Sequence, residues 1–88
     1  MSDAADRLQQ LKGRFLARCR EDMAQLTDAA LPEAALQLIA HRIAGLAGTF
    51  GLAELGEIAR ALDQRLSQQQ PYAAERSALV TALTRLLE

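Results

Sequence analysis

Apolar residues recur every three or four positions along most of this 88-residue chain, and this spacing constrains the fold more than any other feature. Residues at i, i+3, i+4 and i+7 share one face of an α-helix, whereas a half-buried strand alternates at every second residue. Leucine and alanine supply most of the apolar side chains, and β-branched residues, which favour strands, are few. We therefore expect an all-α protein.

Breaks in this spacing divide the chain into four segments joined by short connections. Pro32 suits the first turn of a helix, and Gly51 suits the residue just after one. Gly13 is a candidate break that would separate a short leading helix from the main first one. Short connections place consecutive helices antiparallel, so we predict an antiparallel up-down four-helix bundle, a single domain over residues 1–88. The four segments cover about residues 3–29, 32–50, 53–67 and 72–87.

Charge and cysteine content argue against several classes of function. The formal net charge of −1 gives no general attraction to nucleic acid, and no apolar run is long enough to span a membrane. Cys19 is the only cysteine, so it forms no internal disulfide, and its helical spacing from Phe15 and Met23 favours a core position over a reactive thiol. The acidic, polar N-terminus is unlike a signal peptide, so we expect a cytoplasmic location. We also expect a monomer. The chain opens with Met1 and lacks a linker, which favours a small complete protein over an excised domain.

The second segment carries a histidine beside two glycines. Stepping 100° per residue gathers its apolar residues in a stripe about 100° wide and puts His41 close to the opposite side. Gly45 and Gly48 follow His41 on that same side. A glycine inside a helix costs about 1 kcal/mol relative to alanine, so two of them suggest that another surface must approach the imidazole. The expected core stripe comprises Leu36, Ile39, Ile43, Leu46, Ala47 and Phe50.

The other neighbours of His41 on the helix surface are Ala34, Gln37 and Ala44, with Leu38 at the flank as an apolar rim for docking. We interpret His41 as a histidine presented to a macromolecular partner for chemistry between the two molecules. The alternative is an alanine-rich face that tolerates small residues and a surface histidine without a function. One histidine and scattered carboxylates do not make a metal cluster, so no metal site is expected.

The stretch from His41 to Leu52 resembles the signature of histidine-containing phosphotransfer (HPt) domains. In that signature the histidine is followed by an apolar residue two positions on, usually lysine at three, glycine at four, and then small residues, an apolar residue and glycine at ten. This chain matches with Ile43, Gly45 and Gly51. The apolar pattern continues into the next helix, and the resemblance spans about residues 8 to 87.

The HPt family carries phosphoryl groups in two-component phosphorelays. The resemblance implies that His41 takes a phosphoryl group from the aspartyl phosphate of a response-regulator receiver domain and returns it, as a carrier rather than an autonomous enzyme. A neutral imidazole, with an ordinary pKa of about 6.5, is nucleophilic near neutral pH. No cofactor of its own is implied, because the receiver supplies the acidic pocket and Mg²⁺. The residues expected to contact the phosphate or the receiver are Gln37, Leu38, Arg42, Ala44, Gly45 and Gly48.

Two positions depart from the family pattern. Ala44 stands where the family usually has lysine, so Arg42 is a candidate for supplying a cation from another angle. Asp63 lies near the position where many members have glutamine or another neutral polar residue. A carboxylate there can orient the imidazole, yet it repels a phosphate. Two alternatives therefore stay open: an HPt-like module that binds a receiver or a hybrid histidine kinase without being phosphorylated, and a structural bundle that self-associates.

Overall fold

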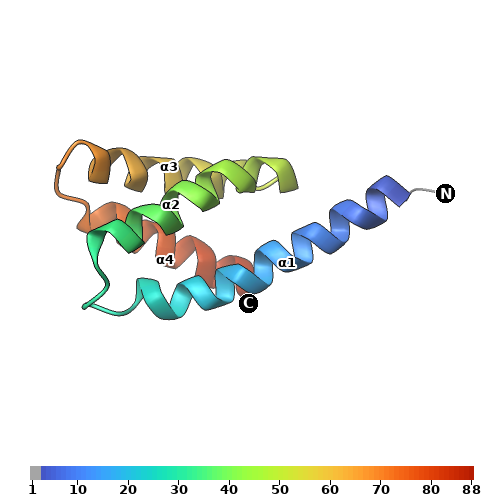
Figure 1. Ribbon diagram of the computed structural model, residues 1–88, viewed down its shortest axis with the longest axis horizontal. Helices are drawn as coiled ribbons and strands as arrows, with labels where there is room; N and C mark the ends of the chain where they lie inside the picture. Colours follow the sequence, from blue (N-terminus) through green and yellow to red (C-terminus); the bar gives the residue numbers. More distant parts are fainter. Residues whose placement is uncertain (1–2) are drawn as a thin grey trace.

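The computed structural model describes residues 3–88, and within them it has four α-helices and one short 3₁₀ helix (Figure 1). This confirms the predicted all-α four-helix fold. The helices are α1 (Asp3–Leu26), α2 (Glu33–Ala47), η1 (Gly48–Phe50), α3 (Ala53–Ser67) and α4 (Ala73–Leu87).

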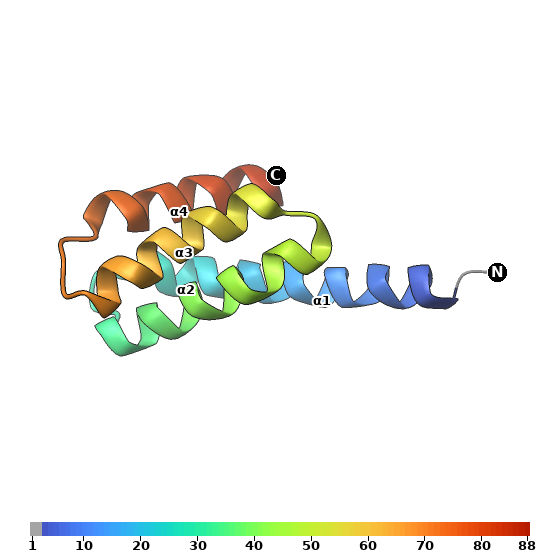
Figure 2. The same cartoon turned by 90° about the horizontal axis from the view of Figure 1, so that it is seen from above.

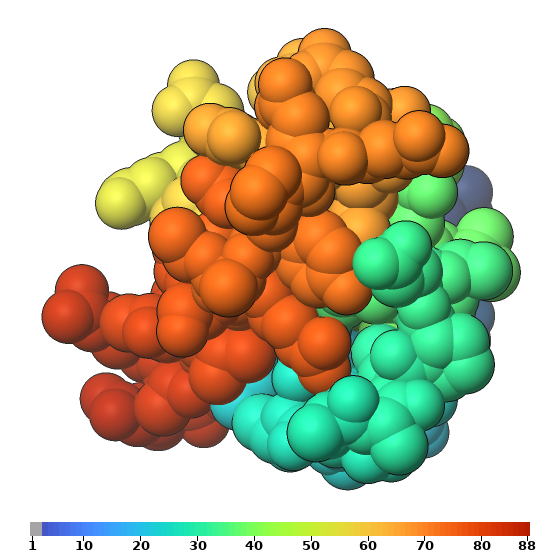
Figure 3. All heavy atoms as spheres, turned by 90° about the vertical axis from the view of Figure 1, so that its left-hand side faces the viewer, coloured from blue at the N-terminus to red at the C-terminus, as the bar shows by residue number. Residues whose placement is uncertain are grey.

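The four α-helices run up and down, and α2 and α3 lie side by side (Figure 2). The α1–α2 and α3–α4 connections close one end of the bundle, which faces the viewer in Figure 3. The connection from α2 through η1 to α3 closes the other end, and the first half of α1 projects beyond it (Figure 1). The molecule is therefore elongated, with extents of 48 × 22 × 20 Å. No helix among residues 3–88 is both long and apolar enough to cross a membrane.

Helix α1 corrects two expectations. It continues through Gly13 without a break, so there is no separate leading helix, and it ends at Leu26. A single glycine costs a helix only about 1 kcal/mol, which the remaining residues of a 24-residue helix offset. Leu8 and Leu11 keep the apolar spacing, but both are exposed because they precede Phe15, the first residue of α1 in the core.

The ends of the helices follow the turn residues of the sequence. Pro32 has an extended ψ of 146° and precedes the first residue of α2, so it lies one position before the predicted first turn. Gly51 adopts the left-handed conformation (φ 73°) directly after η1, as its predicted place at a helix end requires. The end of α1 has no basic residue of its own, and Arg76 of α4 supplies one. Its guanidinium donates hydrogen bonds to the carbonyl oxygens of Leu26 (3.1 and 2.8 Å) and Asp28 (2.9 Å).

The core-facing side of α2 is rotated toward α3 relative to the expected stripe. Leu46, expected in the core, is 40% exposed, and Ala40 is fully buried instead. Small residues cause this shift because they let the two helices approach closely. A Cβ atom added at Gly56 of α3 would lie 3.5 Å from Ala47 Cβ and 3.7 Å from the carbonyl oxygen of Ala44. The expected stripe is otherwise buried or half-buried at Leu36, Ile39, Ile43, Ala47 and Phe50.

A buried ion pair joins α1 to α2. Asp22 is 1% exposed, and its Oδ2 atom lies 2.5 Å from Nη2 of Arg42. Arg18 Nε lies 3.6 Å from the other carboxylate oxygen. Cys19, one turn before Asp22, is fully buried as expected. Burial, together with the nearby negative charge of Asp22, raises the pKa of the Cys19 thiol to about 11. This thiol therefore stays protonated near neutral pH.

We expect Arg42→Met to lower the free energy of unfolding by about 3 kcal/mol, because it leaves the buried Asp22 carboxylate with a more distant cation. Urea denaturation followed by circular dichroism measures the change. Adding Asp22→Asn should recover part of the loss, since it removes the unpaired buried charge. An Arg42→Met variant as stable as the wild type would show that the pair has no structural role.

Candidate functional site

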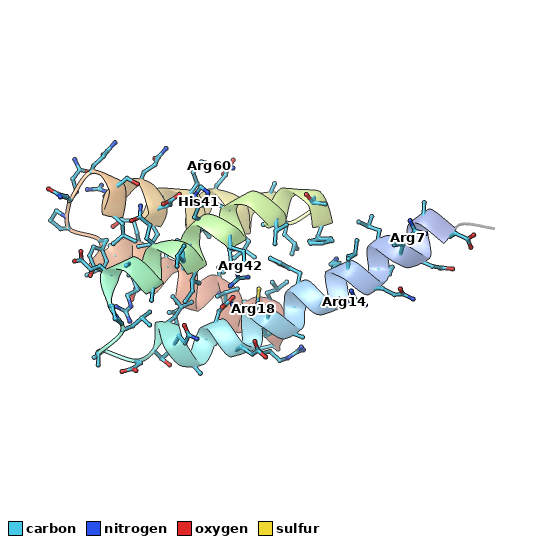
Figure 4. All side chains as sticks on the ribbon, in the orientation of Figure 1. Arg7, Arg14, Arg18, His41, Arg42 and Arg60 are labelled. Atoms are coloured by element: carbon cyan, nitrogen blue, oxygen red, sulfur yellow. The ribbon has the colours of Figure 1, made fainter. Side chains whose placement is uncertain are left out.

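His41 projects from α2 on the side that faces α3 and the solvent (Figure 4). Its side chain is 78% exposed, which agrees with the outward position expected from the helical periodicity. One ring nitrogen is nevertheless fixed, since Nδ1 lies 2.8 Å from Oδ2 of Asp63 on α3. The ring is therefore open to solvent and anchored at one edge.

Gln37 holds the Asp63 carboxylate in place, and Ser67 in turn contacts Gln37. Gln37, one turn before His41 on α2, donates from Nε2 to Oδ1 of Asp63 at 3.1 Å. The same Nε2 atom lies 2.7 Å from Oγ of Ser67, one turn after Asp63 on α3. Both carboxylate oxygens thus accept a hydrogen bond, and the four residues form a network across the α2–α3 interface.

This network decides which nitrogen of His41 carries the proton when the ring is neutral. An ionised carboxylate only accepts hydrogen bonds, so Nδ1 must be the donor in the His41–Asp63 contact. The neutral ring then has its lone pair on Nε2. Within residues 3–88 no side chain or backbone group forms a hydrogen bond with Nε2. The site therefore presents a nucleophilic nitrogen outward.

The surface beside His41 is uncluttered on one side and apolar on the other. A Cβ atom added at Gly45 or Gly48 would meet nothing within 4 Å. Leu38 lies on the opposite side of the ring along the helix and is 72% exposed. A shallow hollow of about 380 Å³ adjoins the imidazole and is lined by Ala34, Gln37, Leu38, His41 and Asp63. The shape leaves room for a second surface to reach the ring.

Arg42 does not belong to this site. Its side chain points toward α1 and not toward the His41 side of the helix (Figure 4), and the ion pair with Asp22 leaves it only 26% exposed. The prediction that Arg42 offers a cation at His41 is therefore wrong, because the buried Asp22 carboxylate holds the Arg42 guanidinium. Ala44 is half-buried beside α3 and contributes no charge.

Sequence reasoning identified His41 and noted that a carboxylate at Asp63 can orient its ring, but it missed two parts of the network. It treated Gln37 as a docking residue, whereas this side chain holds Asp63, and it gave Ser67 no role. The signal was the matching one-turn spacing of 37 and 41 on α2 and of 63 and 67 on α3. No group of three or more His, Cys, Asp or Glu side chains in the described chain is arranged to hold a metal ion.

We expect the neutral His41 ring to be mainly the Nδ1–H tautomer, because Asp63 accepts that proton. Nitrogen-15 chemical shifts of the imidazole at pH 8 measure the tautomer ratio. Asp63→Ala should shift the ratio toward Nε2–H, whereas Gln64→Ala, an exposed change on the same helix, should leave it unaltered. A ratio that Asp63→Ala does not change would show that the contact fails to fix the ring in solution.

Comparison with known proteins agrees with this geometry. The family model described as Hpt domain matches residues 3–88, nearly the whole chain. No curated protein and no solved structure gave a match. Hpt domains are phosphotransfer modules of two-component signalling and act as phosphocarriers rather than enzymes. On the strength of this match and of the exposed histidine in its helical bundle, the chain belongs to the Hpt domain family.

Proposed function

We propose that this protein carries a phosphoryl group on Nε2 of His41 and exchanges it with the aspartate of a response-regulator receiver domain. The observation that supports this most directly is an imidazole that is 78% exposed and whose Nδ1 atom alone is engaged by the protein. In this proposal the protein acts as a cytoplasmic monomer and has no catalytic activity apart from its partner.

The transfer step needs only the groups that the site presents. The Nε2 lone pair attacks the phosphorus atom of the aspartyl phosphate, a new N–P bond forms, and the acyl O–P bond breaks. The receiver's carboxylate leaves with the electron pair of that bond. The Nδ1 proton stays on the ring, which becomes positively charged, and the reverse step returns the phosphoryl group to a carboxylate.

Asp63 has opposite effects on the two ends of the phosphorylated ring. Its carboxylate accepts the Nδ1 proton at 2.8 Å and stabilises the positive charge that the ring gains. It also repels the phosphoryl group at Nε2, but that group lies on the far side of the ring from Asp63. The hydrogen bond that Gln37 donates to Oδ1 reduces the repulsion by drawing negative charge away. The attraction between Asp63 and the positively charged ring therefore outweighs the repulsion between Asp63 and the phosphoryl group.

The receiver would dock on the surface that surrounds the ring. Leu38 offers an exposed apolar contact, and the open surface over Gly45 and Gly48 admits the loops that bring the aspartate to Nε2. Phosphoryl transfer depends on alignment at close range, so side chains over these glycines would keep the reacting atoms apart. In this complex the receiver supplies the acidic pocket and the Mg²⁺ that family resemblance implies.

A second candidate function is receiver or kinase binding without phosphorylation. The observation that favours it is the absence of a cation from α2 near His41, since residue 44 is alanine and Arg42 is paired with Asp22. The docking surface would be the same, so only the chemistry at Nε2 distinguishes the two candidates.

We expect a phosphorylated receiver domain to transfer its label to the wild-type protein and not to His41→Gln, because the amide has no nucleophilic nitrogen. Radiolabelled receivers and acid-labile detection of phosphohistidine measure the transfer. Receiver binding without label on either protein would favour the binding-only function. A stable homodimer that ignores every receiver tested would favour the structural alternative.

We expect Gly45→Glu to weaken receiver binding by about tenfold or more, because the new side chain fills the docking surface and its charge opposes the receiver's acidic pocket. The helix should remain intact, since nothing lies within 4 Å of an added Cβ. Gly13→Glu is the matched control, at an exposed glycine of α1 with equally open surroundings. Isothermal titration measures the affinities, and equal binding by both variants would contradict the assigned surface.

A further inference from the structure

Phosphorylation of His41 would add negative charge that the residues around the ring do not balance. A phosphoryl group at neutral pH carries nearly two negative charges, and Asp63 already places one beside the ring. Gln37 and Ser67 are neutral, and Arg42 is held by Asp22. If this chain supplies a cation that balances the phosphoryl group, that cation comes from another position on the α2–α3 surface.

The register of α2 against α3 identifies that position. Gln37 contacts Ser67, and His41 contacts Asp63. Because the two helices are antiparallel, moving four residues forward on α2 corresponds to moving four residues backward on α3. A further step of about one turn puts the 44–45 region beside residues 59 and 60. One turn further still, a Cβ atom added at Gly56 would lie 3.5 Å from Ala47 Cβ and 3.9 Å from the backbone nitrogen of Gly48, which agrees with this register. Ala59 is buried, so the outward residue at this level is Arg60.

Arg60 is well placed to reach a group on His41. It precedes Asp63 by three residues, and side chains at this spacing are neighbours on one helix face, with Cβ atoms about 5–6 Å apart. Arg60 and His41 emerge on the same side of the molecule, where α2 and α3 meet (Figure 4). The same register places Arg60 across from Ala44, whose short side chain adds little bulk to α2.

The Arg60 guanidinium is also free to bind. It is exposed, and no carboxylate within residues 3–88 forms an ion pair with it. The other cations of the bundle are engaged or lie elsewhere. Arg65 pairs with Glu75, Arg76 binds the end of α1, and Arg85 lies on the last turn of α4. The remaining basic residues are on α1: Arg7, Lys12, Arg14, Arg18 and Arg20.

We infer that Arg60 binds the phosphoryl group on Nε2 of His41 and supplies from α3 the positive charge that α2 lacks. This inference rests on the proposed function of His41. A guanidinium offers two parallel N–H donors to phosphate oxygens, and such charge-assisted pairs are stronger than neutral hydrogen bonds. Arg60 is a binding residue for the carried group and does not take part in the bonds that form or break.

Phosphoramidate tests this inference without a receiver. The Nε2 lone pair forms the N–P bond, the P–N bond of phosphoramidate breaks, and its nitrogen leaves as ammonia after taking a proton from water. The half-life of the phosphohistidine, followed by ³¹P NMR after the donor is removed, reports how well the protein holds the group. Arg60→Gln should shorten this half-life by about three- to fivefold, the size of one exposed charge pair.

Two further variants separate a specific contact from a general charge effect. Arg60→Lys keeps the charge and should retain most of the wild-type half-life. Arg65→Gln removes the same charge from another face of α3 and should leave the half-life unchanged. The difference between wild type and Arg60→Gln should also shrink at 1 M salt, where exposed charges are screened.

The failures of the two proposals are distinguishable. Equal half-lives for wild type and Arg60→Gln, or equal shortening by Arg60→Gln and Arg65→Gln, would overturn the role of Arg60 and leave His41 as the acceptor. A wild-type protein that phosphoramidate does not label would overturn the proposed function and the inference together.

Discussion

The hydrogen bond from His41 Nδ1 to Asp63 joins α2 to α3 and leaves Nε2 without a hydrogen-bond partner among residues 3–88. The contact is only 2.8 Å long, yet the His41 side chain remains 78% exposed. A free surface imidazole would rotate and exchange tautomers, whereas this one has a fixed edge and a fixed proton. The rest of the site follows from that constraint. Gln37, which also contacts Ser67, positions the carboxylate, and the open surface over the glycines gives access to the nitrogen that the carboxylate leaves free.

Close packing of α2 on α3 makes this contact possible. Gly56 and the alanines of α2 remove side-chain bulk from the interface, so the two helices lie close enough for a Cβ atom added at Gly56 to contact the α2 backbone. A short aspartate side chain can then reach the imidazole from the neighbouring helix. The Arg42–Asp22 pair secures α2 from the other side by linking it to α1. The two polar contacts have different roles, because the buried one supports the bundle and the exposed one presents a reactive atom.

Local rules predicted the fold and the centre of the site well. The four helices, the glycine that ends η1 and the outward direction of His41 all follow from periodicity and turn chemistry, which depend on residues near one another in the chain. The structure differs from the periodic pattern at residues whose burial depends on how far one helix lies from another. Leu8 and Leu11 match the apolar pattern, but the partner helices end before them, and Leu46 is exposed because small residues rotate α2 toward α3. The partner of Arg42 lies on a different helix, so no spacing within α2 could reveal it.

In the proposed transfer, Asp63 holds Nδ1 and thereby makes Nε2 the atom that carries the phosphoryl group. The most direct test is to phosphorylate protein containing ¹⁵N-labelled histidine with phosphoramidate and to record which imidazole nitrogen couples to ³¹P. We expect coupling to Nε2 of His41 alone. Coupling to Nδ1 would contradict it, because the phosphoryl group would then occupy the position that Asp63 holds, and a protein without phosphohistidine would contradict the carrier function itself.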